Sequence, residues 1–458
     1  MLEIKDKKVA VIGLSKRTGV ATARMLVQHG ARVVVSDVKG SGELKEEMAM
    51  LEGTGVEYEL EGHGEKSLKS DLIVVSPGVP LDIPFFREAA KRGIPVISEI
   101  ELAFQFTEAK IIAITGTNGK TTTTGLLGDI LKKAKPGRVR VAGNIGIPLI
   151  QEAVGLGSDY WLVTEVSSFQ LETIREFRPV ISLYLNFSPD HLDRHKTVKN
   201  YWEAKRRLFI NQQAEDAAII NIDDPEVVRA AEGCKAEIFA VSLEREVKKG
   251  VFFSDNALFI RTDDYQGPVI NLAEIPLKGR HNQQNVAFAI LAAHLAGADK
   301  SSIREGIRNF VPDRHRLEEI FRDEDGTFFV DDSKATNPDA AIKALYSFTK
   351  PVVLIAGGQD RKADFSALAR VIKERVRILI LLGETRYKIR EEVLKAGFNN
   401  INIHVVDNMR EAVETAFKNK QPGDCLLLSP GCPSWDMYSS YKERGNDFKK
   451  EVALLRGN

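Results

Sequence analysis

The stretch Ile111–Thr124, IIAITGTNGKTTTT, decides the fold at the centre of this chain. A β-branched, apolar run leads into a glycine-rich turn that ends in Gly119, Lys120 and Thr121. Glycines let backbone N–H groups surround phosphate oxygens, a following helix adds the positive end of its dipole, and lysine and threonine supply a charge and a Mg²⁺ ligand. The stretch therefore predicts a strand, a phosphate-binding loop and a helix, with ATP or GTP as the ligand.

The predicted loop departs from the general GxxxxGK(S/T) pattern, because Ile114 stands where the first glycine belongs. Gly116 has to open the turn instead. An ordinary glycine-rich turn before a helix is the alternative, and the lysine–threonine pair argues against it. The candidate nucleotide-binding residues are Gly116, Thr117, Asn118, Gly119, Lys120, Thr121 and Thr122.

The composition is that of an ordinary globular protein: 458 residues, 43% hydrophobic and 28% charged, which predicts two to four domains. Basic and acidic residues both number 64, so no net charge favours nucleic acid or an anionic membrane. The N-terminus enters a strand without an apolar signal region, and no run reaches the ~18 apolar residues of a spanning helix. We expect a cytoplasmic protein without nucleic-acid partners or membrane insertion.

The three cysteines, Cys234, Cys425 and Cys432, have no CxxC spacing, which agrees with a reducing compartment. Cys432 lies in a Gly-Cys-Pro turn. A nucleophile is one interpretation of this cysteine, but a small buried thiol is the one we favour.

Residues 1–100 form the first block of the pattern. KKVAVIG predicts a strand, residues 18–29 a helix, and ARVVVSD a second strand that ends at Asp37. The turn GLSKRTG lacks the glycines of GxGxxG, which argues against bound NAD. A further strand, DLIVVSPGVP, ends at residues 76–78, at the sheet edge where open α/β folds bind ligands.

The second block, residues 101–312, contains the phosphate loop, the strands WLVTEVSS, VISLYLNFS, AAIINID and EIFAVS, and helices over 198–210 and 281–296. Residues 250–277 are polar and have only a weak β-strand pattern. The third block, residues 313–458, alternates strands such as TFFVDD, VVLIAGG and RILILLG with helices. This alternation predicts an α/β fold with a parallel, doubly wound sheet.

Glu165 ends an apolar strand of the second block, from which a carboxylate can reach the Mg²⁺ of a nucleotide. Capping or ion pairing is its alternative role. The segment SPDHLDRH places Asp190, His191, Asp193 and His195 within six residues. A zinc site is one alternative there, although no cysteine lies near. We favour His191 as a ligand of a second Mg²⁺ or as a loop residue that packs on the nucleotide.

The motifs GTNGKTTT, TEVSSFQL, NFSPDHLDRH, YWEAKRRLF and GRHNQQN resemble, in this order, those of the Mur ligases, ATP-dependent enzymes that form amide bonds in peptidoglycan precursor synthesis. DDSKATNPDAA and LSPGCPSWDMY, followed by KERGNDF, resemble the D-glutamate-adding branch. The resemblance spans essentially the whole chain. It implies three domains: an N-terminal Rossmann-like domain for a UDP-linked substrate, a central P-loop ATPase-type α/β domain, and a C-terminal Rossmann-like, doubly wound domain for the amino acid.

The resemblance also implies the reaction. The γ-phosphoryl group of ATP passes to the carboxylate of UDP-N-acetylmuramoyl-L-alanine, and the amine of D-glutamate attacks the resulting acyl phosphate. Lys120 and two Mg²⁺ ions offset the repulsion between the anions, with Thr121 and Glu165 near one ion and His191 near the other. We expect the enzyme to be a monomer.

Each substrate is assigned residues by the same resemblance. Ser333, Lys334 and Ser434 would bind the two carboxylates of D-glutamate, with Lys334 as counter-charge and Ser434 as hydroxyl donor; phosphate binding or a surface ion pair is the alternative for Lys334. Tyr441 stands where the family carries phenylalanine. The implied contacts are Asn282 and Asn285 for adenine, with capping and packing as their alternative, Asp37, Ser76, Gly78 and Asn144 for the UDP-linked substrate, and Asp332, Ser333, Lys334, Ser434 and Tyr441 for D-glutamate.

Lys205 lies beside Arg206 and Arg207, where the sequence alone favours a solvated basic stripe. In the family the matching lysine is carbamylated, which turns a cation into an anion that can help to organise the second Mg²⁺. A lysine reacts with CO₂ only as the neutral amine, which burial or neighbouring cations favour.

Three other functions fit parts of the pattern. The first is another Mur-type ligase or a folylpolyglutamate-type ligase. The second is a nucleotide-gated binding module, against which Glu165, His191 and Lys205 argue, because a switch needs fewer metal ligands. The third, an NAD-dependent oxidoreductase, fails on the missing glycines of the first block.

Overall fold

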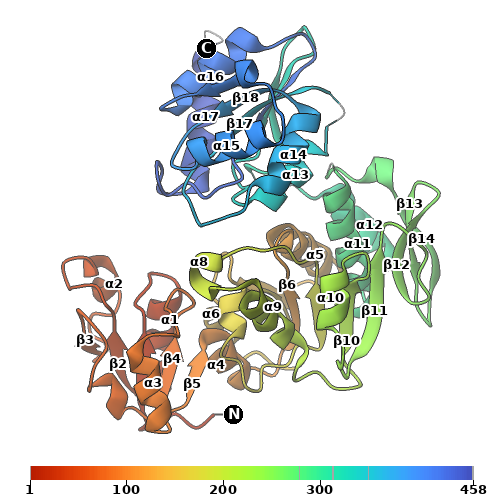
Figure 1. The fold of residues 1–458 in the computed structure, drawn as a ribbon. Coiled ribbons are helices and arrows are strands. Elements are labelled where there is room, and N and C mark those ends of the chain that lie inside the picture. Colours follow the sequence, from red (N-terminus) through yellow and green to blue (C-terminus); the bar gives the residue numbers. More distant parts are fainter. Residues whose placement is uncertain (1, 278, 312–313, 349, 456–458) are drawn as a thin grey trace. The chain divides into compact units, whose positions relative to one another are not determined.

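The computed structural model describes residues 2–277, 279–311, 314–348 and 350–455, and the side chain of Asp193 lies outside the description. The chain forms two compact units (Figure 1). The first unit comprises Met1–Phe187, Lys199–Glu274 and Gln284–Phe310, and the second comprises Ser188–Val198, Ile275–Gln283 and Val311–Asn458. The domain boundary predicted at residues 312 and 313 lies outside the described residues, and the boundaries of the three predicted blocks stay a prediction.

The N-terminal part of the first unit is a five-stranded parallel sheet in the order β3-β2-β1-β4-β5, which is Rossmann-like as predicted. Val9 and Val11 of the central strand enter one apolar cluster and Ala10 and Ile12 another, so both faces are covered. The elements are β1 (Lys8–Ile12), α1 (Thr18–Gln28), β2 (Arg32–Ser36), α2 (Lys45–Ala49), β3 (Glu57–Glu59), η1 (Ser67–Lys69), β4 (Leu72–Val75), α3 (Pro84–Lys91), β5 (Val96–Ser98) and α4 (Glu99–Gln105).

The rest of the first unit is built on a nine-stranded sheet in the order β14-β13-β12-β11-β10-β9-β6-β8-β7. The weakly β region predicted over 250–277 is an antiparallel edge, while the other strands pair in parallel. The strands are β6 (Lys110–Thr115), β7 (Val139–Gly143), β8 (Trp161–Glu165), β9 (Ile181–Tyr184), β10 (Ala217–Asn221), β11 (Glu237–Ser242), β12 (Gly250–Ser254), β13 (Ala257–Arg261) and β14 (Gln266–Asn271). The helices are α5 (Lys120–Ala134), α6 (Leu149–Ala153), α7 (Ser168–Leu171), α9 (Val198–Arg206), η2 (Arg207–Phe209), α10 (Pro225–Ala230), η3 (Leu272–Glu274), α11 (Arg280–Leu295) and α12 (Lys300–Arg308).

The register of this sheet positions the phosphate loop. β6 lies between β8 and β9, and Glu165, the last residue of β8, is level with Ile114 of β6. The phosphate loop follows β6 directly. The loop and the Glu165 carboxylate therefore share the carboxyl edge of the sheet, where α/β folds bind ligands.

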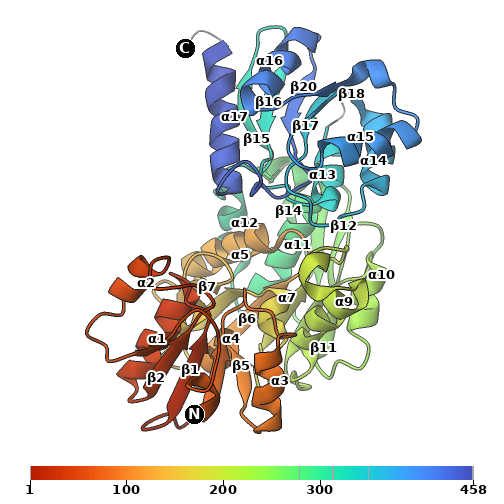
Figure 2. The ribbon, with the colours of Figure 1, turned by 60° about the vertical axis from the view of Figure 1, so that its left-hand side comes forward.

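The second unit contains a six-stranded sheet in the order β15-β16-β20-β17-β18-β19, in which only β15 is antiparallel. Helices α13, α14 and α15 pack on one face and α16 and α17 on the other (Figure 2), which confirms the predicted doubly wound sheet. The elements are α8 (Leu192–His195), β15 (Glu318–Arg322), β16 (Phe328–Asp331), α13 (Pro338–Leu345), β17 (Val352–Ala356), α14 (Ser366–Arg375), β18 (Val376–Leu381), α15 (Arg386–Lys395), η4 (Asn400–Asn402), β19 (Ile403–Val405), α16 (Met409–Asn419), β20 (Cys425–Leu428) and α17 (Tyr441–Leu455).

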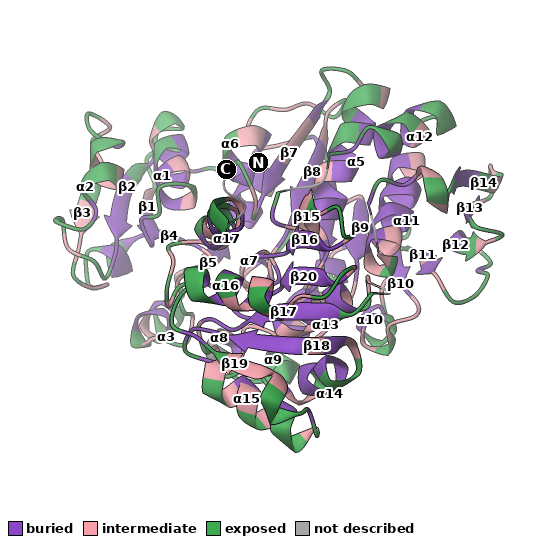
Figure 3. Ribbon diagram, turned by 90° about the horizontal axis from the view of Figure 1, so that it is seen from above, coloured by how far each residue is buried: buried purple, intermediate pink, exposed green. Residues whose placement is uncertain are grey.

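The strands are buried and the outer faces of the helices are exposed, as Figure 3 shows for β17 and β18 beside α15. Strand β15 and helices α12 and α17 have no counterpart among the predicted elements. Among the described residues, no helix combines the length and apolar character that crossing a membrane requires.

Candidate active site

The phosphate loop between β6 and α5 has the backbone that a phosphate cradle requires. Gly119 caps α5 with φ 85°, a left-handed conformation, and a Cβ atom there would lie 2.2 Å from the side-chain oxygen of Asn285. Asn186 holds the loop: its carbonyl accepts the Thr117 N–H at 3.0 Å, and its side chain exchanges two hydrogen bonds with the Asn118 backbone, at 2.9 and 3.0 Å. Sequence reasoning missed Asn186, although it opens the NFSPDHLDRH motif.

Two lysines converge on this loop. Lys120 Nζ donates to the carbonyl oxygens of Gly116 and Thr117, both at 2.8 Å, and Lys205 Nζ donates to the same Gly116 oxygen at 2.8 Å. Lys205 is 1% exposed and its ammonium lies 4.9 Å from the ring centroid of Tyr201, one helical turn earlier on α9. The interpretation of Lys205 as part of a solvated basic stripe is therefore wrong, because its side of α9 faces the loop.

Glu165 connects the phosphate loop to a neighbouring strand end. One carboxylate oxygen accepts a hydrogen bond from Thr121 Oγ1 at 2.9 Å, and the other accepts one from Asn144 Nδ2, also at 2.9 Å. Thr121 lies in the first turn of α5, beside the buried Thr122, and Asn144 follows β7. Hard oxygen donors therefore lie side by side at the entrance of the loop, as a Mg²⁺ ion requires.

A cavity of about 850 Å³ lies at the carboxyl edge of the five-stranded sheet and extends to the end of β7. All four residues predicted to contact the UDP-linked substrate line it. They are Asp37, Ser76, Gly78 and Asn144. Arg17 and Gln170 line the same cavity. Asn144 therefore belongs both to this cavity and to the hydrogen bonds around Glu165.

Two of these residues also shape the cavity wall. The Asp37 carboxylate accepts the backbone N–H groups of Leu14, at 2.7 Å, and Lys39, at 3.0 Å. Ser76 Oγ donates to the Gly13 carbonyl oxygen at 2.7 Å. The bonds to Leu14 and Gly13 fix the turn between β1 and α1, which is the turn that lacks the dinucleotide glycines.

In the second unit, His191 lines a separate cavity of about 300 Å³ at the carboxyl edge of the six-stranded sheet. Arg361 Nη1 lies 3.4 Å from His191 Nδ1, and Arg361 stacks at 4.6 Å over the ring of Trp435. Asn337 donates to the neighbouring carboxylate of Asp190 at 3.0 Å. Sequence reasoning missed Arg361, which the strand-end segment GGQDRKADF could have indicated.

Ser333 and Ser434 follow β16 and β20, which are parallel neighbours, so both serines lie at one sheet edge. Arg444 ties these two strand ends together. Its Nε donates to Ser333 Oγ at 3.0 Å and its Nη1 to the Cys432 carbonyl at 3.0 Å, while Ser333 Oγ donates to the Tyr441 carbonyl at 2.8 Å. Burial lowers the pKa of Arg444 to about 10. Sequence reasoning gave Arg444 no role.

Asp332 and Lys334 flank Ser333. Asp332 accepts a hydrogen bond from Ser429 Oγ at 2.8 Å, and burial raises the pKa of its carboxyl group to about 7. The Lys334 ammonium lies 5.8 Å from the ring centroid of Tyr441, so the tyrosine ring can share the packing role of a phenylalanine.

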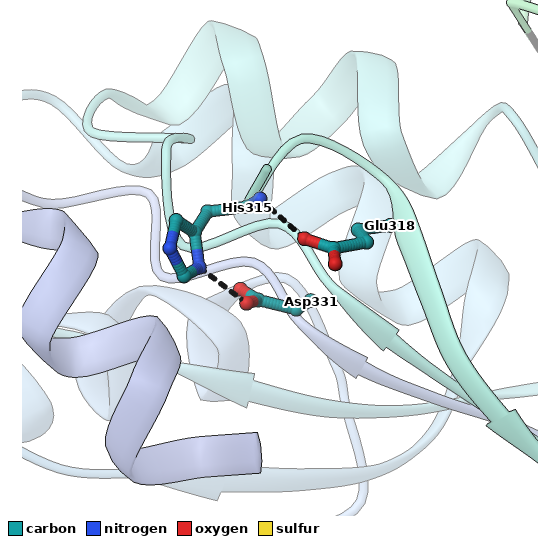
Figure 4. Close-up of side chains that lie close together, drawn as sticks. All are labelled: His315, Glu318 and Asp331. Atoms are coloured by element: carbon teal, nitrogen blue, oxygen red, sulfur yellow. Dashed lines mark hydrogen bonds and ion pairs between the residues drawn. The ribbon is translucent and has the colours of Figure 1, made fainter. Parts of the chain in front are cut away.

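Next to this edge, His315, Glu318 and Asp331 lie close enough to share a metal ion (Figure 4). His315 Nδ1 lies 2.6 Å from Asp331 Oδ2, and the backbone N–H of His315 donates to Glu318 Oε2 at 2.7 Å. Lys449 already supplies a cation, at 2.7 Å from Glu318 and 3.5 Å from Asp331. The cluster is therefore an internal ion network. The His315 carbonyl accepts the Lys334 N–H at 3.0 Å, which joins the network to the predicted amino-acid site.

Of the remaining predictions, Asn282 and Asn285 are both buried in the first turns of α11, Asn282 in the second unit and Asn285 in the first. Cys432 is buried, and burial raises the pKa of its thiol to about 12, as expected for a packing residue. The described residues of SPDHLDRH form no metal-binding group, so nothing in them favours the zinc alternative.

The chain matches three domain families in sequence. Residues 7–98 match the Mur ligase MurD-like N-terminal domain, residues 114–293 the Mur ligase middle domain, and residues 315–432 the Mur ligase glutamate ligase domain. Together these matches run through most of the chain in the order that the resemblance implied.

Curated relatives match over nearly full length. A protein of Pelotomaculum thermopropionicum named UDP-N-acetylmuramoylalanine--D-glutamate ligase is 44% identical over 453 residues, which covers 98% of each chain. A protein of the same name from Clostridioides difficile is 42% identical and covers 99% of this chain and 100% of its own.

Solved structures agree on the fold. MurF from Acinetobacter baumannii superposes with a TM-score of 0.63 at 17% identity, covering 97% of this chain and 93% of its own. The UDP-N-acetylmuramate-alanine ligase MurC from Thermotoga maritima gives a TM-score of 0.57 at 16% identity, covering 98% and 100%. The phosphate loop, the strand-end carboxylate, the three domain matches and the full-length relatives lead to one conclusion: this chain belongs to the Mur ligase family.

Proposed function

We propose that this protein is the ATP-dependent, ADP-forming ligase that joins D-glutamate to UDP-N-acetylmuramoyl-L-alanine in peptidoglycan precursor synthesis. One structural observation carries the proposal. Glu165 accepts hydrogen bonds from Thr121 of the phosphate loop and from Asn144 of the large cavity. A nucleotide on the loop and a substrate in the cavity would therefore meet at this carboxylate. The relatives named for the same reaction support the choice of substrates.

In this reaction the substrate carboxylate attacks the γ-phosphorus of ATP, ADP leaves, and the amine of D-glutamate then displaces phosphate from the acyl phosphate. The first step brings two anions together. The Lys120 ammonium donates to the Gly116 and Thr117 carbonyl oxygens in this structure. With nucleotide bound, it would turn towards the transferring phosphoryl group and stabilise its negative charge. The N–H groups at the start of α5 would hold the other phosphate oxygens.

Mur ligases are ATP-dependent and typically use Mg²⁺, and the residues here fit that ion. Thr121 and Glu165 offer a hydroxyl and a carboxylate oxygen 2.9 Å apart, the hard ligands that Mg²⁺ prefers. When bound, Mg²⁺ would offset the negative charge that develops on the phosphate oxygens. We propose that a carbamate on Lys205, whose buried nitrogen lies beside the loop, helps to organise a second ion. His191, which belongs to the second unit, stays a prediction from the sequence as a ligand of that ion.

We assign D-glutamate to the edge of the six-stranded sheet. Lys334 and Ser434 would bind its carboxylates, Ser333 and Tyr441 would hold the backbone around it, and Asp332 would help to orient Lys334. Arg361 and His191 line the cavity at the same edge. The Arg361 guanidinium therefore offers a second positive charge, beside that of Lys334, for a substrate with two carboxylates. A monomeric, cytoplasmic enzyme stays a prediction from the sequence.

The test is ADP release with ATP, UDP-N-acetylmuramoyl-L-alanine and one amino acid at a time, namely D-glutamate, L-glutamate, L-alanine, L-lysine and meso-diaminopimelate. We expect release with D-glutamate only. A Lys120→Met variant is the control for contaminating ATPases: it should melt at the wild-type temperature and lose at least about 100-fold in turnover, the usual cost of one electrostatic stabiliser. Release that depends on another amino acid, or on none, would overturn the proposal.

A further inference from the structure

The wall of the large cavity contains a histidine, His63, for which the proposed reaction has no role so far. His63 lies in the loop that follows β3, the edge strand of the five-stranded sheet. A backbone hydrogen bond holds this loop against the end of β2, because the Gly62 N–H donates to the Asp37 carbonyl oxygen at 3.1 Å. The centroid of the His63 ring lies 5.4 Å from that of Phe85 on α3. Both the loop and the ring of this histidine are therefore held in place.

One hydrogen bond decides which nitrogen of the His63 ring carries the proton. His63 Nδ1 lies 2.7 Å from Ser36 Oγ, and Ser36 Oγ donates to the Gly62 carbonyl oxygen at 3.0 Å. A carbonyl oxygen can only accept, so it takes the single hydroxyl proton of Ser36. Both contacts are satisfied only when Nδ1 is the donor to Ser36. In the neutral ring, Nε2 is then an acceptor.

The acceptor nitrogen of His63 is left for a ligand. Burial lowers the pKa of His63, although the charges of Asp37 and Glu59 act in the opposite direction, so the ring is neutral at about pH 8. In the part of the chain that the structure describes, His63 makes no hydrogen bond besides the one with Ser36. A ligand in the cavity can therefore reach Nε2 only with an N–H or O–H group.

The place of His63 in the fold indicates which part of the UDP-linked substrate it meets. The reacting carboxylate would lie near Asn144, which donates a hydrogen bond to Glu165. Asn144 follows β7 of the nine-stranded sheet, whereas His63 follows the outermost strand of the five-stranded sheet. A substrate with its carboxylate near Asn144 would therefore direct its uridine towards His63. A uridine offers donors of the required kind, namely the N3–H group of the base and the hydroxyl groups of the ribose.

We propose that His63 is a specificity-determining residue of the large cavity: its Nε2 accepts a hydrogen bond from an N–H or O–H group of the uridine. Ser36 is the positioning residue that holds the ring in the required tautomer. The inference rests on the proposed function only for the identity of the ligand. The tautomer itself needs no ligand and can be measured in the free protein.

A ¹H–¹⁵N spectrum of the histidine ring nitrogens, recorded at about pH 8, tests the tautomer. His29 is the internal reference, because its Nδ1 lies 2.9 Å from the Met25 carbonyl oxygen and must carry the proton. We expect His63 to show the Nδ1–H pattern of His29 in the wild-type protein. In Ser36→Ala it should shift towards the Nε2–H form that a free imidazole prefers. A protonated Nε2 at His63 in the wild-type protein would overturn the inference.

Calorimetric titration with UDP-N-acetylmuramoyl-L-alanine then compares His63→Phe and His29→Phe with wild type. Phenylalanine keeps an aromatic ring against Phe85 but has no nitrogen. His29→Phe is the matched control, because His29 also contacts a phenylalanine ring, that of Phe106 at 5.1 Å, and does not line the cavity. We expect Kd to rise about fivefold to tenfold in His63→Phe, the size of one lost hydrogen bond, and to stay within about twofold in His29→Phe. The KM values for ATP and D-glutamate should stay within about twofold in both.

Three nucleotides identify the donor: CDP, which has an acceptor at N3, and 2′-deoxy-UDP and 3′-deoxy-UDP, which each lack one hydroxyl group. The change that removes the partner of Nε2 should weaken binding to wild type relative to UDP. The same change should cost His63→Phe less, because the interaction is already absent there. Equal losses in both proteins for all three nucleotides would overturn the inference.

A folded His63→Phe protein that binds the UDP-linked substrate within about twofold of wild type would also overturn it. If His63→Phe does not fold, Ser36→Ala keeps the ring and releases the tautomer, and it must show the same selective loss. Wild-type protein that does not bind the UDP-linked substrate would instead contradict the proposed function. The ring spectrum of the free protein tests the role of Ser36 on its own, so the two failures are distinguishable.

Discussion

At the scale of single residues, the two interpretations of Lys205, a carbamate that organises metal ions and a plain cation, predict different results for the same variant. Lys205 is buried against the phosphate loop, so Lys205→Ala should cut turnover severely, by at least about 100-fold for a lost electrostatic group. If a carbamate on Lys205 helps to organise the metal ions, acetate or formate should restore part of the activity by filling the anionic position. Turnover measured with each additive, alongside a melting curve, checks this prediction.

Arg206→Ala is the control for the Lys205 variant. Arg206 is half exposed and pairs with Glu203 at 3.3 Å, a surface contact of little energetic value. Its substitution should leave activity unchanged. Rescue of Lys205→Ala by small amines and not by carboxylates would mean that Lys205 acts as a plain cation, and it would exclude the carbamate.

The burial of Lys205 could not be predicted from three basic residues in a row. Residues four apart share a helix face, so Lys205 and Tyr201 face the loop together, whereas Arg207 donates to the carbonyl oxygens of Leu171 and Ile174. This difference in surroundings between Lys205 and Arg207 depends on how α9 packs against the phosphate loop, which the sequence does not show. The same limit hid the roles of Asn186 and Arg444, because Asn186 bonds the backbone of Asn118 and Arg444 the backbone of Ser333, both far away in sequence.

At the scale of elements, the phosphate loop depends on one left-handed residue. Gly119→Ala should weaken ADP binding about tenfold or more, because a Cβ atom there meets Asn285 at 2.2 Å and a left-handed alanine costs roughly 1–2 kcal/mol. Calorimetric titration with ADP checks this expectation. Gly125→Ala is the matched control on α5, where a Cβ atom has only ordinary contacts, and it should bind ADP normally and melt no lower than wild type.

Unchanged ADP binding by a folded Gly119→Ala protein would mean that the nucleotide does not bind at this loop.

The strand–loop–helix itself was predictable because its signals are local: β-branched residues, glycines and a lysine–threonine pair at fixed spacing. Strand β15 and helix α17 were not predictable in this way. β15 (Glu318–Arg322) is rich in charge and is defined by its antiparallel pairing with β16, and α17 buries only a narrow face that includes Phe448 and Val452.

At the scale of the whole molecule, the alternation of short apolar strands with helices predicted the α/β class, and the family resemblance implied the three-domain architecture. The motifs also named Thr121 and Glu165 as candidate ligands of one metal ion, and the family resemblance named Asn144 for the UDP-linked substrate; the structure joins all three by hydrogen bonds. What they could not show is that Asn144 also donates a hydrogen bond to Glu165. That double position links the phosphate loop to the large cavity, and it comes from the packing of two sheets within one unit.

The proposed activation by ATP of a carboxylate held in the large cavity has a direct isotopic test. UDP-N-acetylmuramoyl-L-alanine labelled with ¹⁸O in its carboxylate is turned over with ATP and D-glutamate, and the released phosphate is analysed by mass spectrometry. In the proposed reaction the attacking carboxylate oxygen becomes the bridge of the acyl phosphate and leaves with phosphorus when the amine attacks carbon. We expect one ¹⁸O atom in each phosphate, formed only with D-glutamate; phosphate without ¹⁸O would contradict activation of the carboxylate by ATP.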